Sequence, residues 1–480
     1  MSCVVLFLAF FAALTVPRLM AFGTSDPLRG LHRLLRNHHK PKLGTIGSLS
    51  RDCSQIGIKT LEDGGNAADA QMVATEICIG VVGMCATGLG SGGFVLIRAP
   101  NGSYEFVDFR PSAPAAAFEN MFVDNGNASL WGGLASAVPG ELRARDGFVV
   151  SQDLVDIFYQ LEDASFLTND PVWATDFSPT GTRVKAGDVM TRKRYAELLE
   201  VVSLGGADAF YTGKVAENNI ATIRAANGTM SLEDLRDYRV LKRKPLDITY
   251  RGFKVTSCGV SGSGSLVLSV MKTIEGYSGM DDSTWVNMST YRMEEAMTFG
   301  YSARMQLGDK VVNKSLEMIE DDTASNIRSN IFNPSNLPIS DYDPAGIEVE
   351  ETPSTSHISA IDSSGLALAL TSTINLYFGS RVMVPETGLI MNNLMNDFST
   401  SEQTDHFGFA SSPANFIVPG KRPLSAMSPT IVEKLTDGNL HLVIGGAGGS
   451  HVTTAIIQCL WNVLDRNLTI PEDSAPAPTT

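Results

Sequence analysis

The segment from Thr352 to Phe378 constrains the fold of this chain more than any other part of the sequence. Two runs rich in Ile, Leu and Ala, with interleaved polar residues, flank the turn residues Ser363-Ser364-Gly365. This pattern predicts a β-hairpin, because apolar residues line the buried faces of strands and Ser and Gly favour the turn between them. The hairpin places Thr355 at the mouth of its first strand.

Thr355 has two possible roles. A threonine hydroxyl becomes a nucleophile when a base is held beside it, and the threonine's own α-amine can be that base. The amine is free only if the chain is cut immediately before Thr355, and α-amines titrate at about 7.7–8.0, close to neutral pH. The alternative is that Thr355 is one of many strand threonines, and the hairpin alone favours that alternative.

Motifs along the rest of the chain decide between these roles. The later ones are Ser372-Thr373-Ile374-Asn375, Asn392-Asn393, Asp397-Phe398-Ser399, Pro419-Gly420-Lys421 and Gly448-Gly449. The earlier ones are Asp63 to Ala70, Gly88 to Phe94, Asp108-Phe109-Arg110 and Val138 to Glu141. In this order they resemble the γ-glutamyltransferases, also called glutathione hydrolases, and their spelling is closest to fungal members. The resemblance runs from about Cys53 to about Asp465.

The fold is the first thing that the resemblance implies. Alternating helix and strand patterns allow several α/β layer folds. The resemblance selects the N-terminal nucleophile hydrolase fold, a four-layer αββα sandwich with two stacked antiparallel sheets. It also implies a precursor that cuts itself between Ser354 and Thr355. Residues 51–354 would then form the large subunit and residues 355–480 a small subunit that is shortened at its C-terminus.

The resemblance also implies roles for individual residues. Thr355 would be the nucleophile of γ-glutamyl transfer or hydrolysis, and Thr373 would orient it. The amides of Gly448 and Gly449 would form the oxyanion hole, because glycine amides donate without side-chain interference. The structural alternative for these glycines is a plain strand-to-helix turn.

Substrate binding is assigned in the same way. Arg110 would bind the α-carboxylate of the glutamyl group, for which the guanidinium fork is suited, with Ser425 as a second contact. Asp397 would contact the glutamyl group on the side of its α-ammonium, and Asn375 would contact it on the side of its backbone. Without the resemblance, Arg110 would be interpreted as a solvated surface arginine.

Two positions depart from the family pattern. Leu394 stands where the family has Glu or Gln beside the ammonium, and Ala426 stands where a second serine contacts the carboxylate. Each lost hydrogen bond to a charged group weakens binding by about 1–3 kcal/mol. Two alternatives to an active γ-glutamyl enzyme therefore stay open, namely a non-catalytic family member and an acylase with a changed acyl preference.

Composition and motifs exclude several other classes. A net charge of −15 argues against a nucleic-acid-binding surface. The G-x-G-x-x-G run at 88–93 follows a predicted helix and precedes a predicted strand, which is the reverse of the dinucleotide-binding order. The sequence has neither H-E-x-x-H nor C-x-x-C. We therefore expect no metal or cofactor. The resemblance implies glutathione and other γ-glutamyl compounds as substrates, with water, an amino acid or a dipeptide as acceptor.

The N-terminal residues predict entry into the secretory pathway. The apolar run from Val4 to Val16 is short for a membrane span and suits a signal peptide over residues 1–23, with an uncleaved anchor as the alternative. Residues 24–50 are expected to form a flexible arm. We expect a secreted, vacuolar or membrane-anchored protein with a Cys53–Cys78 disulfide, which the resemblance implies. Six glycosylation sequons agree with this location, at Asn101, Asn127, Asn227, Asn287, Asn313 and Asn467.

Hydrophobic periodicity gives a coarse assignment of secondary structure. Helices are expected over 52–82, 192–202, 215–226, 266–276 and 452–464, and strands over 94–98, 104–109 and 246–255.

Overall fold

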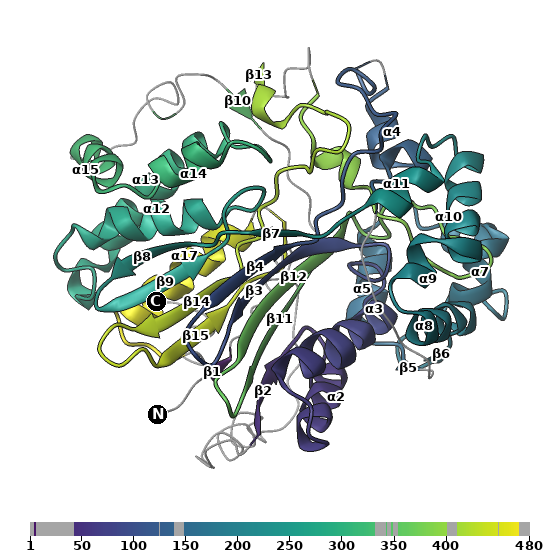
Figure 1. The fold of residues 1–480 in the computed structure, drawn as a ribbon, viewed down its shortest axis with the longest axis horizontal. Helices are drawn as coiled ribbons and strands as arrows, with labels where there is room; N and C mark the ends of the chain where they lie inside the picture. Colours follow the sequence, from purple (N-terminus) through teal and green to yellow (C-terminus); the bar gives the residue numbers. More distant parts are fainter. Residues whose placement is uncertain are drawn as a thin grey trace, which may run out of the picture.

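Two antiparallel sheets lie face to face at the centre of the molecule (Figure 1). The computed structural model describes residues 4–5, 43–123, 125–138, 148–331, 342, 347–348, 354–400, 410–449 and 451–469. The first sheet has six strands, in the order β2 (Gly44–Gly47), β11 (Ser354–Asp362), β12 (Ala367–Asn375), β3 (Gly92–Arg98), β4 (Tyr104–Asp108) and β7 (Leu241–Arg243). All neighbours in it are antiparallel.

The second sheet has five strands. Their order is β1 (Val4–Val5), β15 (Leu440–Ile444), β14 (Thr430–Lys434), β9 (Phe253–Ser257) and β8 (Leu246–Tyr250). The pairs are antiparallel except that β1 runs parallel to β15. Two further sheets have two short strands each, β5 (Phe148–Val149) with β6 (Val189–Met190) and β10 (Ile347–Glu348) with β13 (Ala410–Ser411).

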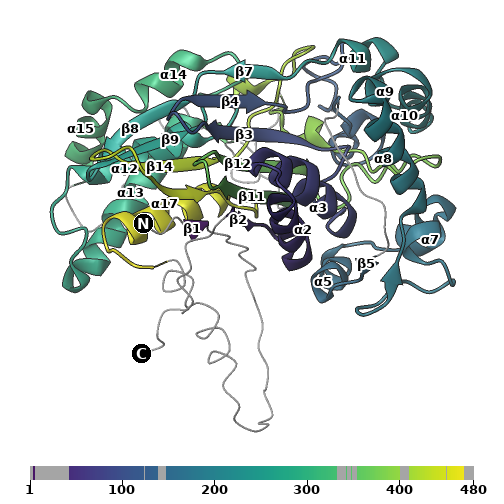
Figure 2. The same cartoon turned by 60° about the horizontal axis from the view of Figure 1, so that its bottom comes forward.

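Helices cover the outer face of each sheet (Figure 2). The first sheet is covered by α2 (Arg51–Glu62), the π-helix η1 (Asp69–Glu76) and α3 (Ile77–Val82). The second sheet is covered by α12 (Gly264–Glu275), α13 (Val286–Arg304) and α17 (His451–Leu464). The four layers are therefore helix, sheet, sheet and helix.

The remaining helices flank these layers. Beside the first sheet and its helices lie α5 (Gln152–Gln160), α6 (Phe166–Asn169), α7 (Pro171–Phe177), α8 (Lys193–Gly205), α9 (Asp208–Tyr211), α10 (Gly213–Ala225) and α11 (Leu232–Asp237). The others are α4 (Asn127–Leu130), α14 (Val312–Glu317) and α15 (Asp321–Asn330). No helix in the described part of the chain is both long and apolar enough to span a membrane.

Strand alternation explains the layering, because successive side chains point to opposite faces of a sheet. Ile358 and Leu368 of the β11–β12 hairpin pack with Leu61 and other helix residues on the outer face. Phe94 and Val443 belong to the apolar cluster between the two sheets. Both faces of the first sheet are therefore buried.

The predicted β-hairpin is confirmed. Strands β11 and β12 pair in antiparallel register, with His357 opposite Thr371, and Gly365 in the turn has φ +86°. The register shifts between the pair Ser354–Asn375 and the pair Ser356–Ser372. Between these pairs, Thr355 of β11 lies opposite two residues of β12, Thr373 and Ile374, which form a β-bulge.

The prediction of one helix over 52–82 is wrong. Helix α2 ends at Glu62, and Gly64 then has φ +98°, a backbone conformation that favours glycine. The Asn66 side chain accepts hydrogen bonds from the amides of Ala68 and Asp69, which lets a second helical segment begin. The Asp63-Gly64-Gly65-Asn66 run therefore separates two helical segments and is not part of one continuous helix.

The predicted N-terminal segments are described only in part. Within residues 1–23, only Val4 and Val5 belong to the described residues, and they pair with Leu442 and Val443. Residues 24–42 of the predicted flexible arm lie outside the described residues. Gly44–Gly47 form β2 against β11, so this end of the arm is part of the sheet.

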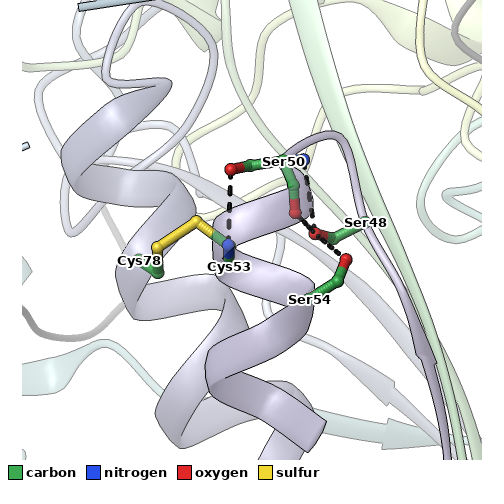
Figure 3. Close-up of a disulfide and its surroundings, with 5 residues drawn as sticks. All are labelled: Ser48, Ser50, Cys53, Ser54 and Cys78. Atoms are coloured by element: carbon green, nitrogen blue, oxygen red, sulfur yellow. Dashed lines mark hydrogen bonds between the residues drawn. A yellow bond between two sulfur atoms is a disulfide. The ribbon is translucent and has the colours of Figure 1, made fainter. Parts of the chain in front are cut away.

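The structure contains the Cys53–Cys78 disulfide, which links α2 to α3 (Figure 3). The two Cα atoms are 5.3 Å apart. Ser50 caps the same end of α2, because its hydroxyl accepts a hydrogen bond from the Cys53 amide at 3.3 Å. The bond therefore fixes the start of α2 against the helix that follows the break.

Removing this disulfide is expected to lower the free energy of unfolding by about 3 kcal/mol, because a bond across a sequence separation of 25 restricts the unfolded chain. Urea denaturation of the Cys53→Ala and Cys78→Ala single variants and of the double variant measures this loss. The three variants should lose the same amount, since each removes the same bond. Equal midpoints for wild type and all variants would contradict the expectation.

A buried histidine bridges the two sheets. His357 on β11 lies with Nδ1 2.9 Å from the Thr371 hydroxyl and Nε2 2.9 Å from the Ser359 hydroxyl. Ser359 in turn donates to the Val443 carbonyl on β15 at 3.3 Å. Gly445 lies against the ring, and a Cβ there would be 2.2 Å from the imidazole. Burial lowers the pKa of His357 to about 3.

Stability is consequently expected to fall as the pH is lowered from about 6.5 towards 3. An unfolded histidine takes up a proton at about 6.5, whereas folded His357 does not, so the unfolded state binds more protons in this window. The loss at pH 5 is about 2 kcal/mol. Urea denaturation at pH 7 and pH 5 should show it in wild type and in the exposed control His451→Gln, but not in His357→Gln. The same pH dependence in all three proteins would contradict this.

Candidate active site

The peptide bond between Ser354 and Thr355 lies in β11 at the β-bulge. Ser354 is buried and Thr355 is partly exposed. The Thr373 hydroxyl donates a hydrogen bond to the Ser354 carbonyl, and the Asn375 amide donates to Thr373 Oγ1 at 2.7 Å. Thr373 therefore polarises the carbonyl of the predicted scissile bond in the uncut chain, and its predicted role of orienting the Thr355 hydroxyl stays a prediction.

Asn375 connects this bond to the next part of the site. It has φ +82°, and its side-chain amide donates to the Asn393 carbonyl at 3.2 Å. Asn393 immediately precedes the short helix η4 (Leu394–Asp397), which carries Asp397. The end of β12 and the start of η4 are thus held together.

Arg110 follows β4 and is fully buried, so the alternative interpretation as a surface arginine is wrong. Its Nη2 donates to the Asp397 carboxylate and, at 3.1 Å, to the Leu424 carbonyl. Nη1 is buried without a hydrogen-bond partner among the residues that the structure describes. Burial lowers the pKa of Arg110, against the opposing effect of Asp397. The predicted carboxylate-binding cation and ammonium-binding anion therefore form an ion pair with each other.

The backbone of Arg110 is held by Asp108 and by residues that the sequence did not single out. Asp108 Oδ1 accepts from the Arg110 amide at 2.9 Å and from Arg422 Nη1 at 2.6 Å. Asp108 Oδ2 accepts from Arg243 Nε at 2.7 Å, and the Tyr238 hydroxyl donates to the Arg110 carbonyl at 3.1 Å. The Asp108-Phe109-Arg110 motif was the only signal for this network, since its other members are far away in the sequence.

Ser425 lies next to the carbonyls that Arg110 contacts. It is buried, and its hydroxyl accepts a hydrogen bond from the Met427 amide at 3.2 Å. Its carbonyl accepts from the Ser263 hydroxyl at 2.6 Å, and its amide donates to the Ser261 carbonyl at 2.9 Å. Ser425 thus directly follows Leu424, whose carbonyl Arg110 contacts, and its predicted contact with the substrate carboxylate stays a prediction.

The two glycines predicted for the oxyanion hole lie between β15 and α17. Gly448 has φ +121° and Gly449 has φ +63°, conformations that favour glycine. A Cβ added to Gly448 would meet nothing within 4 Å, so the backbone on that side is open. Their hydrogen bonds do not link them to the scissile bond in the uncut chain, and their predicted catalytic role stays a prediction.

Leu394, which departs from the family pattern, occupies an apolar core position in the structure. Leu394 is fully buried and packs in one cluster with Ala113, Phe122 and Phe398. A carboxylate in this apolar cluster would lose its hydration. Within the described ranges, no group of three or more His, Cys, Asp or Glu side chains could hold a metal ion.

Comparisons with known proteins match most of the length of this chain. The family model described as Gamma-glutamyltranspeptidase matches residues 53–144 and 143–476. The "Glutathione hydrolase proenzyme" of Arthroderma benhamiae is 45% identical, over 90% of this chain and 81% of that protein. The "Glutathione hydrolase" of Aspergillus flavus is 41% identical, over 92% of this chain and 79% of that protein. The predicted resemblance to fungal members is confirmed.

Solved structures with the same fold extend the comparison. Cephalosporin acylase from Bacillus halodurans superposes with a TM-score of 0.75 at 21% identity, over 95% of this chain and 85% of that chain. The Helicobacter pylori gamma-glutamyltranspeptidase superposes with a TM-score of 0.59 at 28% identity, over 63% of this chain and 95% of that chain. The predicted N-terminal nucleophile hydrolase fold is thereby confirmed. With the family model matching most of its length and relatives above 40% identity, the chain belongs to the gamma-glutamyltranspeptidase family.

Proposed function

We propose that this protein is a self-processing glutathione hydrolase that cleaves γ-glutamyl amide bonds through Thr355. The observation that carries the proposal is the hydrogen bond from Thr373 to the Ser354 carbonyl, at a bulge in an otherwise regular strand. A donor aimed at a carbonyl stabilises the negative charge that develops there during nucleophilic attack. The names of the fungal relatives, one of them a proenzyme, support the same reaction class.

The first step is cleavage of the chain. The Thr355 hydroxyl attacks the Ser354 carbonyl carbon, the bond from that carbon to the Thr355 nitrogen breaks, and the nitrogen takes up the hydroxyl proton. Water then hydrolyses the resulting ester, which leaves a carboxylate on Ser354 and a free amine and hydroxyl on Thr355. The threonine has thereby gained the base that it needs.

The second step is turnover. The Thr355 hydroxyl attacks the γ-carbonyl of the substrate while its α-amine takes the proton, and the Gly448 and Gly449 amides stabilise the oxyanion. The leaving amine departs with a proton, and an acyl-enzyme remains. Water resolves the acyl-enzyme to glutamate, or an amino acid or dipeptide amine takes the glutamyl group.

Recognition of the glutamyl group rests on Arg110 and Asp397. Their charges are opposite to those of the α-carboxylate and α-ammonium of an amino acid. Arg110 Nη1 is also a buried donor without a hydrogen-bond partner among the described residues. The substrate would replace the contact between the two side chains by one contact to each. Fork-shaped pairing of Arg110 with a carboxylate supplies the orientation.

An acylase for less polar acyl groups is the second candidate, because Leu394 places an apolar residue beside Asp397 on η4. A single experiment separates the candidates. Purified protein is analysed by intact mass and N-terminal sequencing, and a γ-glutamyl anilide is compared with a simple acyl anilide. A new N-terminus at Thr355 with faster γ-glutamyl turnover is expected. Faster acyl turnover would favour the acylase, and an uncut, inactive chain would contradict both.

A further inference from the structure

A buried carboxyl group lies on the helix side of the hairpin, behind the predicted scissile bond. Glu76 is the last residue of η1, and its Oε1 accepts hydrogen bonds from the Ser372 hydroxyl and, at 2.9 Å, from the Thr87 hydroxyl. These two hydroxyls are 2.6 Å apart, so the three side chains form a closed triangle. Glu76 Oε2 is buried and has no hydrogen-bond partner within the described ranges.

Each partner of Glu76 belongs to a segment that holds Ser354. Ser372 precedes Thr373, whose hydroxyl donates to the Ser354 carbonyl. Thr87 ends the loop 83–87, in which the Cys85 carbonyl accepts the Ser354 hydroxyl at 3.2 Å. The Ala86 carbonyl of the same loop accepts the Ile374 amide of the β-bulge at 2.9 Å. The triangle therefore connects the segment that holds the carbonyl of Ser354 to the loop that holds its side chain.

The position of Ser372 in the sheet makes this connection specific to the bulge. Ser372 pairs with Ser356, and the register shifts between this pair and Ser354–Asn375. A hydrogen bond to Ser372 thus fixes β12 at the place where its register with β11 changes.

The electrostatic state of Glu76 indicates what a substitute must provide. Burial raises the pKa of Glu76, and its hydroxyl partners oppose that effect. A carboxyl group buried without a cation is stabilised in its neutral form, which an amide of the same shape imitates. Gln should therefore retain the contacts to Ser372 and Thr87, whereas Leu fills the volume and retains neither.

We propose that Glu76 is a positioning residue for self-cleavage, because it fixes the loop 83–87 to β12 and so holds Ser354 between Thr373 and Cys85. The role rests on the proposed function, since it assumes the cut between Ser354 and Thr355. Glu76 does not touch the reacting atoms. It acts through Ser372 and Thr87, and a displacement of about 1 Å at a reacting group reduces rates by about 100-fold.

The test follows conversion of freshly purified, full-length precursor into two pieces by denaturing gel and intact mass. Glu76→Leu is expected to cut about 10- to 100-fold more slowly than wild type, and Glu76→Gln within about threefold of it. Glu62→Leu, an exposed glutamate on the neighbouring helix α2, is the matched control and should cut at the wild-type rate. Thermal melting of each uncut precursor shows that the variants are folded.

Thr87→Val removes the same link without changing the carboxyl group, and it is expected to slow the cut as well. It keeps the test valid if Glu76→Leu does not fold. Wild-type rates in a folded Glu76→Leu or Thr87→Val would overturn the positioning role alone. A wild-type chain that never cuts would overturn the proposed function, and the role of Glu76 with it. Slow cutting in both Leu and Gln variants would show that the site needs the acid itself and would also overturn the role stated here.

Discussion

Replacing Thr355 by alanine is expected to leave the chain uncut and to abolish hydrolysis of γ-glutamyl substrates. The same hydroxyl attacks the Ser354 carbonyl in the first reaction and the substrate in the second, so no part of either reaction remains. Removal of a nucleophile reduces turnover on the order of 10³-fold or more. The fold should persist, because Thr355 is only partly buried.

Denaturing gels, N-terminal sequencing and an anilide assay measure both reactions on the same preparation. Thr355→Ser is the matched control, because it keeps the hydroxyl and should cut and turn over at reduced rates. Ser356→Ala changes the next hydroxyl, which is buried, and should leave both reactions in place. Cutting at the same bond in Thr355→Ala would mean that another group attacks Ser354, and the assignment of the nucleophile would fail.

Breaking the Arg110–Asp397 pair is expected to have the second largest effect, on stability and activity together. The Arg110 side chain is fully buried and that of Asp397 is 12% exposed. Removing one partner of such a pair leaves an unpaired buried charge, which lowers the free energy of unfolding by about 3–5 kcal/mol. Arg110→Met and Asp397→Leu should each lose that much in the free energy of unfolding.

The double variant separates the two roles of the pair. Arg110→Met with Asp397→Leu leaves no unpaired charge, so its stability should return towards that of wild type. Its kcat/KM should nevertheless stay about 100-fold or more below wild type, since each lost contact to a charged substrate group is worth about 1.5–3 kcal/mol. Urea denaturation and steady-state kinetics on the same proteins measure the two quantities.

The exposed pair Arg236–Asp237 provides the control for this cycle. Its double variant Arg236→Met with Asp237→Leu should change neither stability nor turnover noticeably, because exposed ion pairs contribute about 0–1 kcal/mol. Recovery of activity in the Arg110–Asp397 double variant would show that the pair is only structural. The substrate would then bind elsewhere.

The sequence predicted the parts of the fold that depend on local pattern. The hairpin of β11 and β12, the strands near 94–98 and 104–109, and helices α8, α10, α12 and α17 follow from periodicity and were found close to their expected bounds. The strand predicted over 246–255 is instead the hairpin of β8 and β9. Arg251 and Gly252 form its turn with φ +47° and +82°, and the apolar residues on both sides concealed this turn.

The contacts between distant segments could not be predicted from the sequence. Glu76 is one of several polar residues of η1, and its partner Ser372 is 296 residues away. Asp108 and Arg422 are separated by 314 residues, although their side chains are hydrogen-bonded to each other. Individual site residues followed from motifs, but the groups that position them depend on which strands are neighbours, and short motifs do not specify that.

The order of the strands determines how the two pieces would be held together after a cut at Ser354. In the first sheet β12, from the later part of the chain, is paired with β3 from the earlier part, and in the second sheet β14 is paired with β9. The two pieces would therefore share both large sheets rather than meet at a surface. Each alone would expose unpaired strand edges, which favour aggregation. Covalent continuity is thus needed only once, during folding, and two separately made halves would have to find by diffusion an interleaved arrangement that the single chain reaches while it folds.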